Sequence, residues 1–504
     1  MSVEVTNQHG FVGGRHLAQN VIWNLLGFGL PPLIGLAAIP TILEGLGIDR
    51  FGILTIAWAV LGYFSVFDLG IGRALTKLVA EKLGLCDTLK IPALIGTALV
   101  VVAVLGLAGV LSLALLSPWL VQNMLKIPTA SQAEATDAFY LLALSIPFVI
   151  STAALRGILE AYQRFGLVNI VRIPLGILTF LGPLLVLPFS NSLVPVVAVI
   201  AAGRAIAWAI YGWLCVRLVP ELRHKIQVKW SMLRELLVFG GWLAVTNVVG
   251  PVMVYMDRFF ISAIISIGAV AYYATPYEVV TRLLIIPSAL IGVVYPAFST
   301  TMVSDPSRAG RILWQSVNYI FLALFPLTLI IVGFAHDALR LWIGASFANK
   351  STFVLQWLAA GVLLNSLAYP PFAFVQGAGF PHLSARIHLI ELPLYLLALW
   401  WLLHRFGIDG AAIAWTFRVA LDAVLFFIQT RKLLPGNDRE LLSIATMTII
   451  AIGAFIFAAQ LTNLTTKVFF VSGVLIVTSC LGWRILLTPT ERQFVQSVCK
   501  IKAG

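Results

Sequence analysis

The sequence predicts an all-α protein that crosses a membrane many times, and three observations support this fold class. Hydrophobic residues make up 60% of the chain and charged residues only 11%, whereas soluble domains are about 25% charged. The mean hydropathy is +0.97. The apolar segments are long enough to cross a bilayer as helices, which takes roughly 20 residues. The composition therefore excludes the two or more soluble domains that the length alone would allow.

Fourteen apolar segments are predicted to be membrane-spanning helices, joined by loops too short to hold a soluble domain. They cover residues 17–42, 51–71, 91–117, 137–160, 167–189, 193–217, 236–263, 268–298, 311–334, 351–377, 382–404, 408–430, 441–460 and 467–487. The longest predicted loops are residues 118–136 and 218–235. The first span is too long for the core of a signal peptide, so we expect it to remain in the protein.

The charges in the loops predict the orientation. Loops after even-numbered spans, together with both termini, hold most of the lysines and arginines. Loops after odd-numbered spans hold only Arg50, Lys126, Arg340, Lys350, Arg405 and Lys467. Because basic loops stay in the cytoplasm, both termini are predicted to be cytoplasmic. The same bias explains the net charge of +12 without a nucleic-acid partner.

The two halves of the chain show signs of an internal repeat with an offset of 219 residues. Residues 155–174 align with residues 374–393, so that Pro174 falls on Pro393 and Arg172 falls on Glu391. Each half holds an even number of spans, so both insert in the same orientation. Repeats of this kind place a substrate site between the halves. The pattern predicts a two-lobed transporter whose embedded charges face a central cavity.

The predicted domains follow from the repeat and the loops. They are a cytoplasmic tail (1–16), an N-lobe (17–217), a basic cytoplasmic linker (218–235), a C-lobe (236–430), a peripheral pair of helices (441–487) and a cytoplasmic C-terminal tail (488–504).

No catalytic or metal-binding motif occurs in the chain. GxxxxGK[ST], HExxH, GxSxG, CxxC and DxD are all missing, and the four cysteines are scattered, so we expect free thiols and no metal site. The sequence therefore favours a transporter over an enzyme, and over a pump driven by a nucleotide that this chain binds. A membrane-bound glycan polymerase or ligase is disfavoured, because no sizeable outer loop is available.

Three stretches resemble a known family. Residues 20–73 contain Leu46-Gly47, Phe51-Gly52 and the sequence DLGIGR at 68–73. Met256-Asp257-Arg258 is followed by Gly268 and Tyr272-Tyr273. The turn Gln376-Gly377-Ala378-Gly379 leads to Ala385-Arg386 and Leu392-Pro393. In their order and spacing these motifs resemble the polysaccharide-biosynthesis (Wzx-type) oligosaccharide flippases of the MOP exporter superfamily.

The resemblance implies a MATE-like fold, with two six-helix lobes around a V-shaped cavity and two additional helices. It implies a flippase of the bacterial inner membrane that moves a polyprenyl-pyrophosphate-linked oligosaccharide to the periplasmic leaflet by alternating access. It implies no cofactor, and either a proton or a sodium gradient as the driving force. Membrane lipids are expected partners, and a polysaccharide polymerase and chain-length machinery are candidate partners. The alternative is a MATE-type ion-coupled exporter of drugs or metabolites.

Embedded arginines are the candidate substrate-binding residues, since a guanidinium stays charged and matches phosphate oxygens in pairs. Arg204, Arg418 and Arg282 lie near the middle of predicted spans, too deep to reach an interface roughly 15 Å away. Arg418 with Asp422, and Arg282 with Glu278, have the alternative of a structural ion pair, whereas Arg204 has no acid within a turn.

Four further arginines lie closer to span ends. Arg156, Arg172 and Arg386 lie about one turn inside cytoplasmic ends, where they would receive the pyrophosphate or simply extend to the interface. Arg258 lies toward an outer end and would contact the substrate on release or form part of an outer gate.

Five embedded acids are candidate ion-coupling residues: Asp68, Asp257, Glu278, Glu391 and Asp422. A carboxyl in a low-dielectric cavity holds a proton readily and can exchange it during transport. The alternative is that each acid neutralises a nearby arginine.

Overall fold

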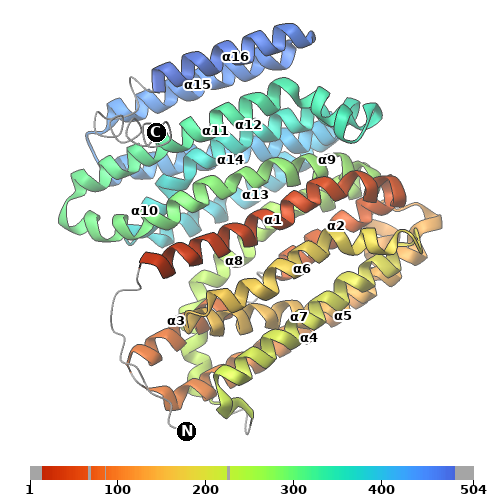
Figure 1. Cartoon of the computed structure of the whole chain (residues 1–504), viewed down its shortest axis with the longest axis vertical. Coiled ribbons are helices and arrows are strands. Elements are labelled where there is room, and N and C mark those ends of the chain that lie inside the picture. Colours follow the sequence, from red (N-terminus) through yellow and green to blue (C-terminus); the bar gives the residue numbers. More distant parts are fainter. Residues whose placement is uncertain (1–13, 66–69, 86, 224–227, 483–504) are drawn as a thin grey trace, which may run out of the picture. The chain divides into compact units, whose positions relative to one another are not determined.

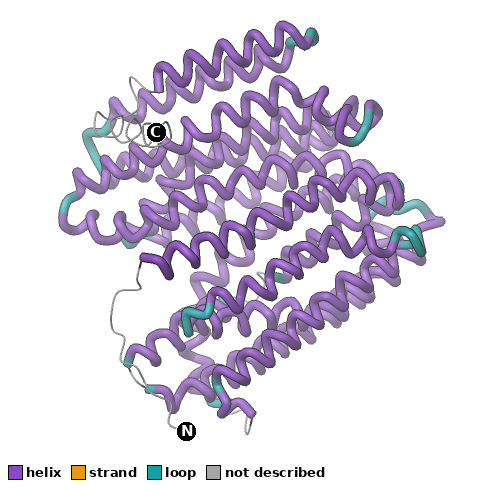
Figure 2. Tube along the Cα trace, viewed as in Figure 1, coloured by secondary structure: helices purple, strands orange, loops and turns teal. Residues whose placement is uncertain are grey.

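The structure is a computed structural model that describes residues 14–65, 70–85, 87–223 and 228–482. These residues form helices joined by loops and turns, and no strand occurs among them (Figure 2). The predicted all-α class is therefore confirmed. The predicted tail 488–504 and most of the predicted tail 1–16 lie outside the described residues.

Twelve helical segments of the described chain are long and apolar enough to cross a membrane, which agrees with a multi-pass membrane protein. The prediction was fourteen spans. The two that are not among the twelve, residues 51–71 and 236–263, fall on α2 (Ile48–Phe64), which has only 17 residues, and on α8 (Trp230–Ile264). Each predicted span therefore coincides with a helix, although not always with one of full membrane-spanning length.

The chain divides into two compact units, Met1–Pro251 and Val252–Gly504, and α8 contains the point of division. Unit 1 and unit 2 are described separately below. The predicted linker 218–235 contains the 3₁₀ turn Pro220–Arg223 and the start of α8, with residues 224–227 not described. The assignment of residues 218–235 as the boundary between two lobes stays a prediction.

Unit 1 is built around one long helix. Helix α5 packs against five others of this unit, and α1 packs against α6 (Figure 1). The helices of unit 1 that precede α8 are α1 (Gly14–Leu46), α2 (Ile48–Phe64), α3 (Ile71–Gly84), α4 (Ile91–Trp119), α5 (Thr129–Ala161), α6 (Phe165–Val186) and α7 (Leu193–Leu218). Gly106 lets α4 approach α5 closely, because a Cβ at this position would lie 2.8 Å from the Cα of Pro147.

The prediction of one continuous span over residues 51–71 was wrong. Helix α2 ends at Phe64, and α3 begins after Gly70, which adopts a left-handed conformation with φ of 75°. Helix α3 covers residues that were predicted to be loop. Its apolar residues from Ile71 to Val79 are buried, while Arg73 and Lys77 are exposed. The sequence signal for this helix is therefore its apolar stripe, which the high density of basic residues obscured.

The predicted loop 118–136 is also largely helical. Helix α4 continues through the π-helical turn Leu120–Met124, and α5 already begins at Thr129. Glu134 in the first turns of α5 accepts hydrogen bonds from Arg50 Nε at 2.9 Å, from Ser192 Oγ at 2.8 Å and from the backbone N–H of Leu193. These bonds connect α5 to the starts of α2 and α7, which explains why the helix extends so far.

Unit 2 is built around α12, which packs against six other α-helices, and α15 and α16 run side by side and pack on α11 (Figure 1). After the end of α8, the helices of unit 2 are α9 (Ile267–Thr281), α10 (Ile285–Ser304), α11 (Pro306–Trp342), α12 (Ala345–Gly377), α13 (Pro381–Phe406), α14 (Ile408–Leu433), α15 (Asp438–Gln460) and α16 (Leu464–Leu481). The predicted span 268–298 corresponds to α9 and α10, joined by the 3₁₀ turn Arg282–Leu284. Lys467 of α16 forms an ion pair with Asp337 of α11 at 2.5 Å.

Candidate functional site

Arg204 of unit 1 is the embedded arginine that has no acid beside it. It lies near the middle of α7 and is partly buried, and its Nε is buried with no hydrogen-bond partner. The described chain shows no ion pair to this residue. A guanidinium held in such a place retains its full capacity to bind an anion, since no carboxylate competes for it. Arg204 therefore remains the substrate-binding candidate of unit 1.

Arg156 and Arg172 come close together, on the neighbouring helices α5 and α6. Arg156 forms an ion pair with Glu160 at 3.4 Å, one turn further along α5. Arg172 lies within electrostatic range of Arg156, Glu160 and Tyr211. Tyr211 of α7 is buried and donates a hydrogen bond to the carbonyl of Val168 at 2.8 Å. The structure thus groups these two arginines but gives one of them an acidic neighbour, so both predicted roles stay open.

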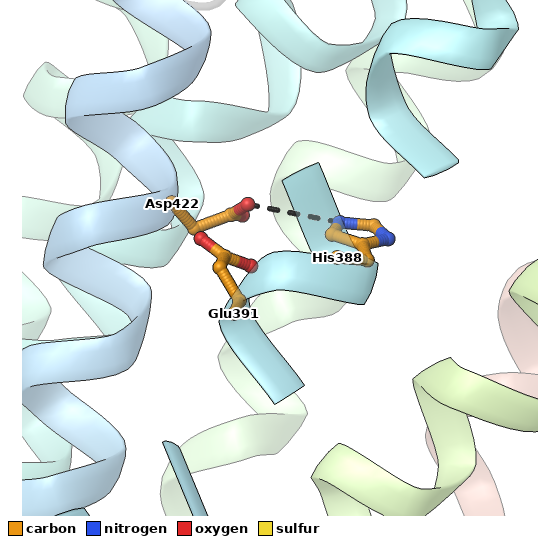
Figure 3. A group of neighbouring side chains, drawn as sticks. All are labelled: His388, Glu391 and Asp422. Carbon is orange, nitrogen blue, oxygen red and sulfur yellow. Dashed lines mark ion pairs between the residues drawn. The ribbon is translucent and has the colours of Figure 1, made fainter. Parts of the chain in front are cut away.

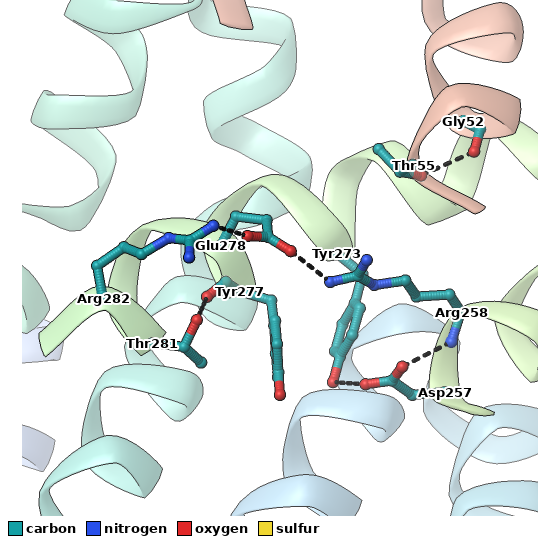
Figure 4. Close-up of polar contacts among 9 residues, drawn as sticks. All are labelled: Gly52, Thr55, Asp257, Arg258, Tyr273, Tyr277, Glu278, Thr281 and Arg282. Atoms are coloured by element: carbon teal, nitrogen blue, oxygen red, sulfur yellow. Dashed lines mark hydrogen bonds and ion pairs between the residues drawn. The ribbon is translucent and has the colours of Figure 1, made fainter. Parts of the chain in front are cut away.

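Arg258 and Arg282 of unit 2 are held by acids in a group that we call the arginine–acid cluster, formed by Asp257, Arg258, Tyr273, Glu278 and Arg282 (Figure 4). Arg258 Nη2 donates to Glu278 Oε1 at 2.7 Å, and the other oxygen of Glu278 accepts from Arg282. Tyr273 Oη donates to Asp257 Oδ2 at 2.6 Å. Two carboxylates face two guanidinium groups, so the cluster is electrically balanced.

Burial decides the role of this cluster. Arg258 is 1% exposed and Asp257 is 0% exposed, so both are buried. Arg258 also lies near the rings of Tyr255 and Tyr277, at 5.6 and 5.5 Å from their centroids. These contacts favour the structural interpretation of Arg258, Arg282, Asp257 and Glu278, in which each acid neutralises an arginine.

Two aromatic residues, Tyr273 and Tyr277, lie at this cluster (Figure 4). Tyr273 and Tyr277 are buried, stack on each other with centroids 5.9 Å apart, and Tyr277 packs edge-on against Trp415. Their faces are therefore occupied by protein. Their role is to pack the interior of unit 2.

Arg418 of α14 does not form the ion pair with Asp422 that its spacing suggested. Its Nη1 lies 3.8 Å from the sulfur of Met253, and its guanidinium lies 5.6 Å from the centroid of the Tyr395 ring. Its Nε is buried without a hydrogen-bond partner. Within the described residues Arg418 therefore resembles Arg204 in having no carboxylate bound to it.

Asp422 instead belongs to a second group, which we call the acid–histidine cluster: His388 and Glu391 of α13 with Asp422 of α14 (Figure 3). His388 Nε2 lies 3.6 Å from Asp422 Oδ1. One ligand atom from each residue lies within 4.8 Å of the others. These are also ligand types that metal ions use, so the predicted absence of a metal site stays a prediction.

His388 is the residue that sequence reasoning missed. It lies in a predicted span, three residues before Glu391, and an i, i+3 pair shares one face of a helix. This spacing was the available signal. It was overlooked because the prediction considered only arginines and acids.

Two predicted residues add little to these groups. Arg386 is exposed near the start of α13, and no ion pair is found for it in the described chain, which fits a side chain reaching an interface. Asp68 lies outside the described residues.

Comparisons with known proteins identify the class of the protein. The family model described as polysaccharide biosynthesis protein matches residues 17–302. A protein of Shigella flexneri described as an O-antigen transporter is 32% identical over 415 residues, which are 81% of this chain and 96% of that protein. This relative is described as a transporter, which confirms the predicted class of transporter rather than enzyme.

Solved structures confirm the fold. The lipid II flippase MurJ, in an inward closed conformation, has a TM-score of 0.72 and is 14% identical, with 93% of this chain and 100% of that chain covered. An inward-facing multidrug resistance MATE transporter of the MOP superfamily has a TM-score of 0.67 and is 13% identical, with 85% and 95% covered. The MATE-like fold, the family match and the transporter relative agree with one another. The chain belongs to the polysaccharide biosynthesis protein family.

Proposed function

We propose that this protein is a flippase for a lipid-linked oligosaccharide, which it moves from the cytoplasmic to the periplasmic leaflet of the bacterial inner membrane by alternating access. The observation that carries the proposal is the likeness to the O-antigen transporter, which covers 96% of that protein. The substrate would carry a polyprenyl pyrophosphate, and its glycan would serve the synthesis of a surface polysaccharide. Both termini would lie in the cytoplasm, and an ion gradient would supply the driving force.

Arg204 and Arg418 are the residues we propose for the pyrophosphate. A flippase must offer the anionic head group a cationic route, because hydrocarbon opposes the phosphates and not the lipid tail. Both guanidinium groups are embedded in a membrane-spanning helix, and no carboxylate of the described residues binds either of them. Such arginines suit an anionic substrate. The likeness to MATE transporters is one of fold alone, and it does not favour a drug as the substrate.

The experiment replaces Arg204 in a strain that lacks the chromosomal copy of the gene, and scores surface polysaccharide. We expect Arg204→Ala and Arg204→Lys to abolish surface polysaccharide at normal abundance in the membrane, because a lysine lacks the planar fork that binds two phosphate oxygens. Arg217→Ala is the matched control. Arg217 lies at the end of the same helix, is exposed and stacks on Trp213 at 3.9 Å.

Two results would contradict the proposal. Full surface polysaccharide with both Arg204 variants would remove this residue from the transport route. Normal surface polysaccharide after deletion of the whole gene would remove the proposed function itself, and transport assays with drugs and metabolites would then be the next step.

A further inference from the structure

The acid–histidine cluster is assembled by two helices of unit 2 that pack against each other. Helix α13 carries His388 and Glu391 one turn apart, and α14 brings Asp422 to face them (Figure 3). One imidazole nitrogen of His388 and one carboxylate oxygen each of Glu391 and Asp422 all lie within 4.8 Å of one another. The side chains therefore converge on one point, and none of the three is directed toward a different partner.

The polar atoms of this cluster lack the partners that burial normally demands. Glu391 is 1% exposed, and both of its carboxylate oxygens are buried with no hydrogen-bond partner. His388 Nδ1 and Asp422 Oδ1 are buried without a hydrogen bond as well. Buried polar groups are nearly always paired, so a carboxylate with neither oxygen satisfied indicates a ligand that the protein atoms do not supply.

The surroundings do not neutralise the two carboxylates. Phe372 of α12 and Phe426 of α14 pack against the imidazole of His388, with ring centroids 6.1 and 6.0 Å away. Arg418 lies within electrostatic range of Glu391, but its Nη1 approaches Met253.

The other titratable groups in electrostatic range supply no further cation. Tyr369 on α12 lies in range of Asp422, and Arg418 itself also lies in range of Asp257 on α8, Tyr277 on α9 and Tyr395 on α13. Among the described residues the two acids therefore share one arginine, which leaves one negative charge for a proton to balance.

We propose that Glu391 and Asp422 share one proton, which His388 relays, and that this site couples transport to a proton gradient. The coupling rests on the proposed function, whereas the site itself does not. Two carboxylates this close do not both stay charged, so one proton satisfies the pair. Only O–H and N–H bonds form and break: the proton is taken from water and returned to water.

A proton fits these residues better than a sodium ion does. Hard cations prefer a shell of oxygen ligands. The phenyl rings around this cluster supply no oxygen, and one of the three converging groups is an imidazole. Chains of acids and histidines within membrane helices are typical of proton relays. His388 and Asp422 are 15% and 14% exposed, against 1% for Glu391, so they give the proton its path to the most buried carboxyl.

The experiment uses the purified full-length protein in liposomes, without any lipid-linked substrate. Infrared difference spectroscopy during a pH titration detects the carbonyl stretch of a protonated carboxyl group. We expect a band at neutral pH that corresponds to one protonated carboxyl per chain and vanishes as pH rises. Glu391→Gln and Asp422→Asn should each remove the band, and His388→Gln should shift its midpoint. Asp438→Asn is the matched control, since Asp438 is 64% exposed and pairs with Arg431, and it should leave the band unchanged.

Several outcomes would overturn the proposal. One is the absence of any such band in the unmodified protein, and another is the persistence of the band in both Glu391→Gln and Asp422→Asn. A third is loss of the band on addition of NaCl or ZnCl₂ at constant pH, because that loss would show that the cluster binds a metal ion. Because two separate carboxyl variants are measured, one that fails to fold does not leave the test undecided. A missing polysaccharide phenotype would contradict the proposed function without affecting this spectroscopic result.

Discussion

The two charged clusters of unit 2 contain similar residues, but the carboxylates accept hydrogen bonds in one cluster, and that of Glu391 accepts none in the other. In the arginine–acid cluster every carboxylate accepts a hydrogen bond from a guanidinium, a phenol or a backbone N–H. In the acid–histidine cluster neither oxygen of Glu391 accepts any. A buried acid that is fully partnered stabilises the packing of helices, whereas a buried acid without a partner stays available for a ligand.

The two clusters also differ in which residues their helices bring together. In the arginine–acid cluster, the main ion pair joins two consecutive helices, α8 and α9, through residues 20 positions apart. In the acid–histidine cluster, consecutive helices meet just as closely, yet their packing brings together two acids and a histidine. Helix packing of the same kind thus produces a balanced site in one place and an unbalanced one in the other.

Of the three substitutions that test this comparison, removal of Arg258 should lower the free energy of unfolding most. Arg258→Ala removes the buried guanidinium, which leaves Asp257 buried without that nearby positive charge and leaves the partly buried Glu278 with Arg282 alone. Breaking a buried ion pair by removal of one partner costs about 3–5 kcal/mol. We expect the free energy of unfolding of the purified protein to fall by that amount, as measured by denaturation in detergent micelles. An unchanged free energy of unfolding would show that the cluster does not stabilise the fold.

Removal of one neutral hydrogen bond from the same cluster should have an intermediate effect. Tyr273→Phe deletes the hydroxyl that donates to Asp257 at 2.6 Å and keeps the ring that stacks on Tyr277. A buried acceptor left unsatisfied costs about 1–3 kcal/mol. The same denaturation measurement should show a loss in this range. A loss as large as that of Arg258→Ala would mean that the hydroxyl, and not the arginine, is the main support of Asp257.

Replacement of the unpartnered acid should have the smallest effect on stability. Glu391→Gln keeps the shape of the side chain and mimics its protonated form, and it breaks no hydrogen bond, because the carboxylate makes none. We expect the free energy of unfolding to fall by less than it does in Tyr273→Phe, because no hydrogen bond is lost. A loss of several kcal/mol would show that Glu391 stabilises the fold, as the acids of the arginine–acid cluster do.

Much of the fold could be predicted from the sequence, and the errors have identifiable causes. Apolar segments fall on helices throughout, since hydrophobicity is a local property. Helix α3 was missed because Arg73, Lys77 and Lys82 resemble a cytoplasmic loop, although the residues between them form a buried stripe. The extension of α4 and α5 into a predicted loop depends in part on Glu134, whose partners lie far away in the sequence.

The candidate residues were predicted with less success than the helices. Their positions inside apolar segments were evident, but helical spacing alone suggested that Arg418 pairs with Asp422. The pairing of Arg282 with Glu278 follows the i, i+4 rule and is present. The guanidinium of Arg418 reaches across to Met253 instead, which leaves Asp422 to His388.

The sequence by itself determined that this chain is a multi-pass helical membrane protein, because long apolar segments and sparse charge leave no other stable arrangement in lipid. Its motifs determined the family. Only the tertiary structure decided which embedded charges are neutralised and which are not. The physical reason is that a buried charge is satisfied by whichever group the packing of helices places within a few ångströms, and that group often lies on another helix, as Glu278 does for Arg258 and His388 does for Asp422.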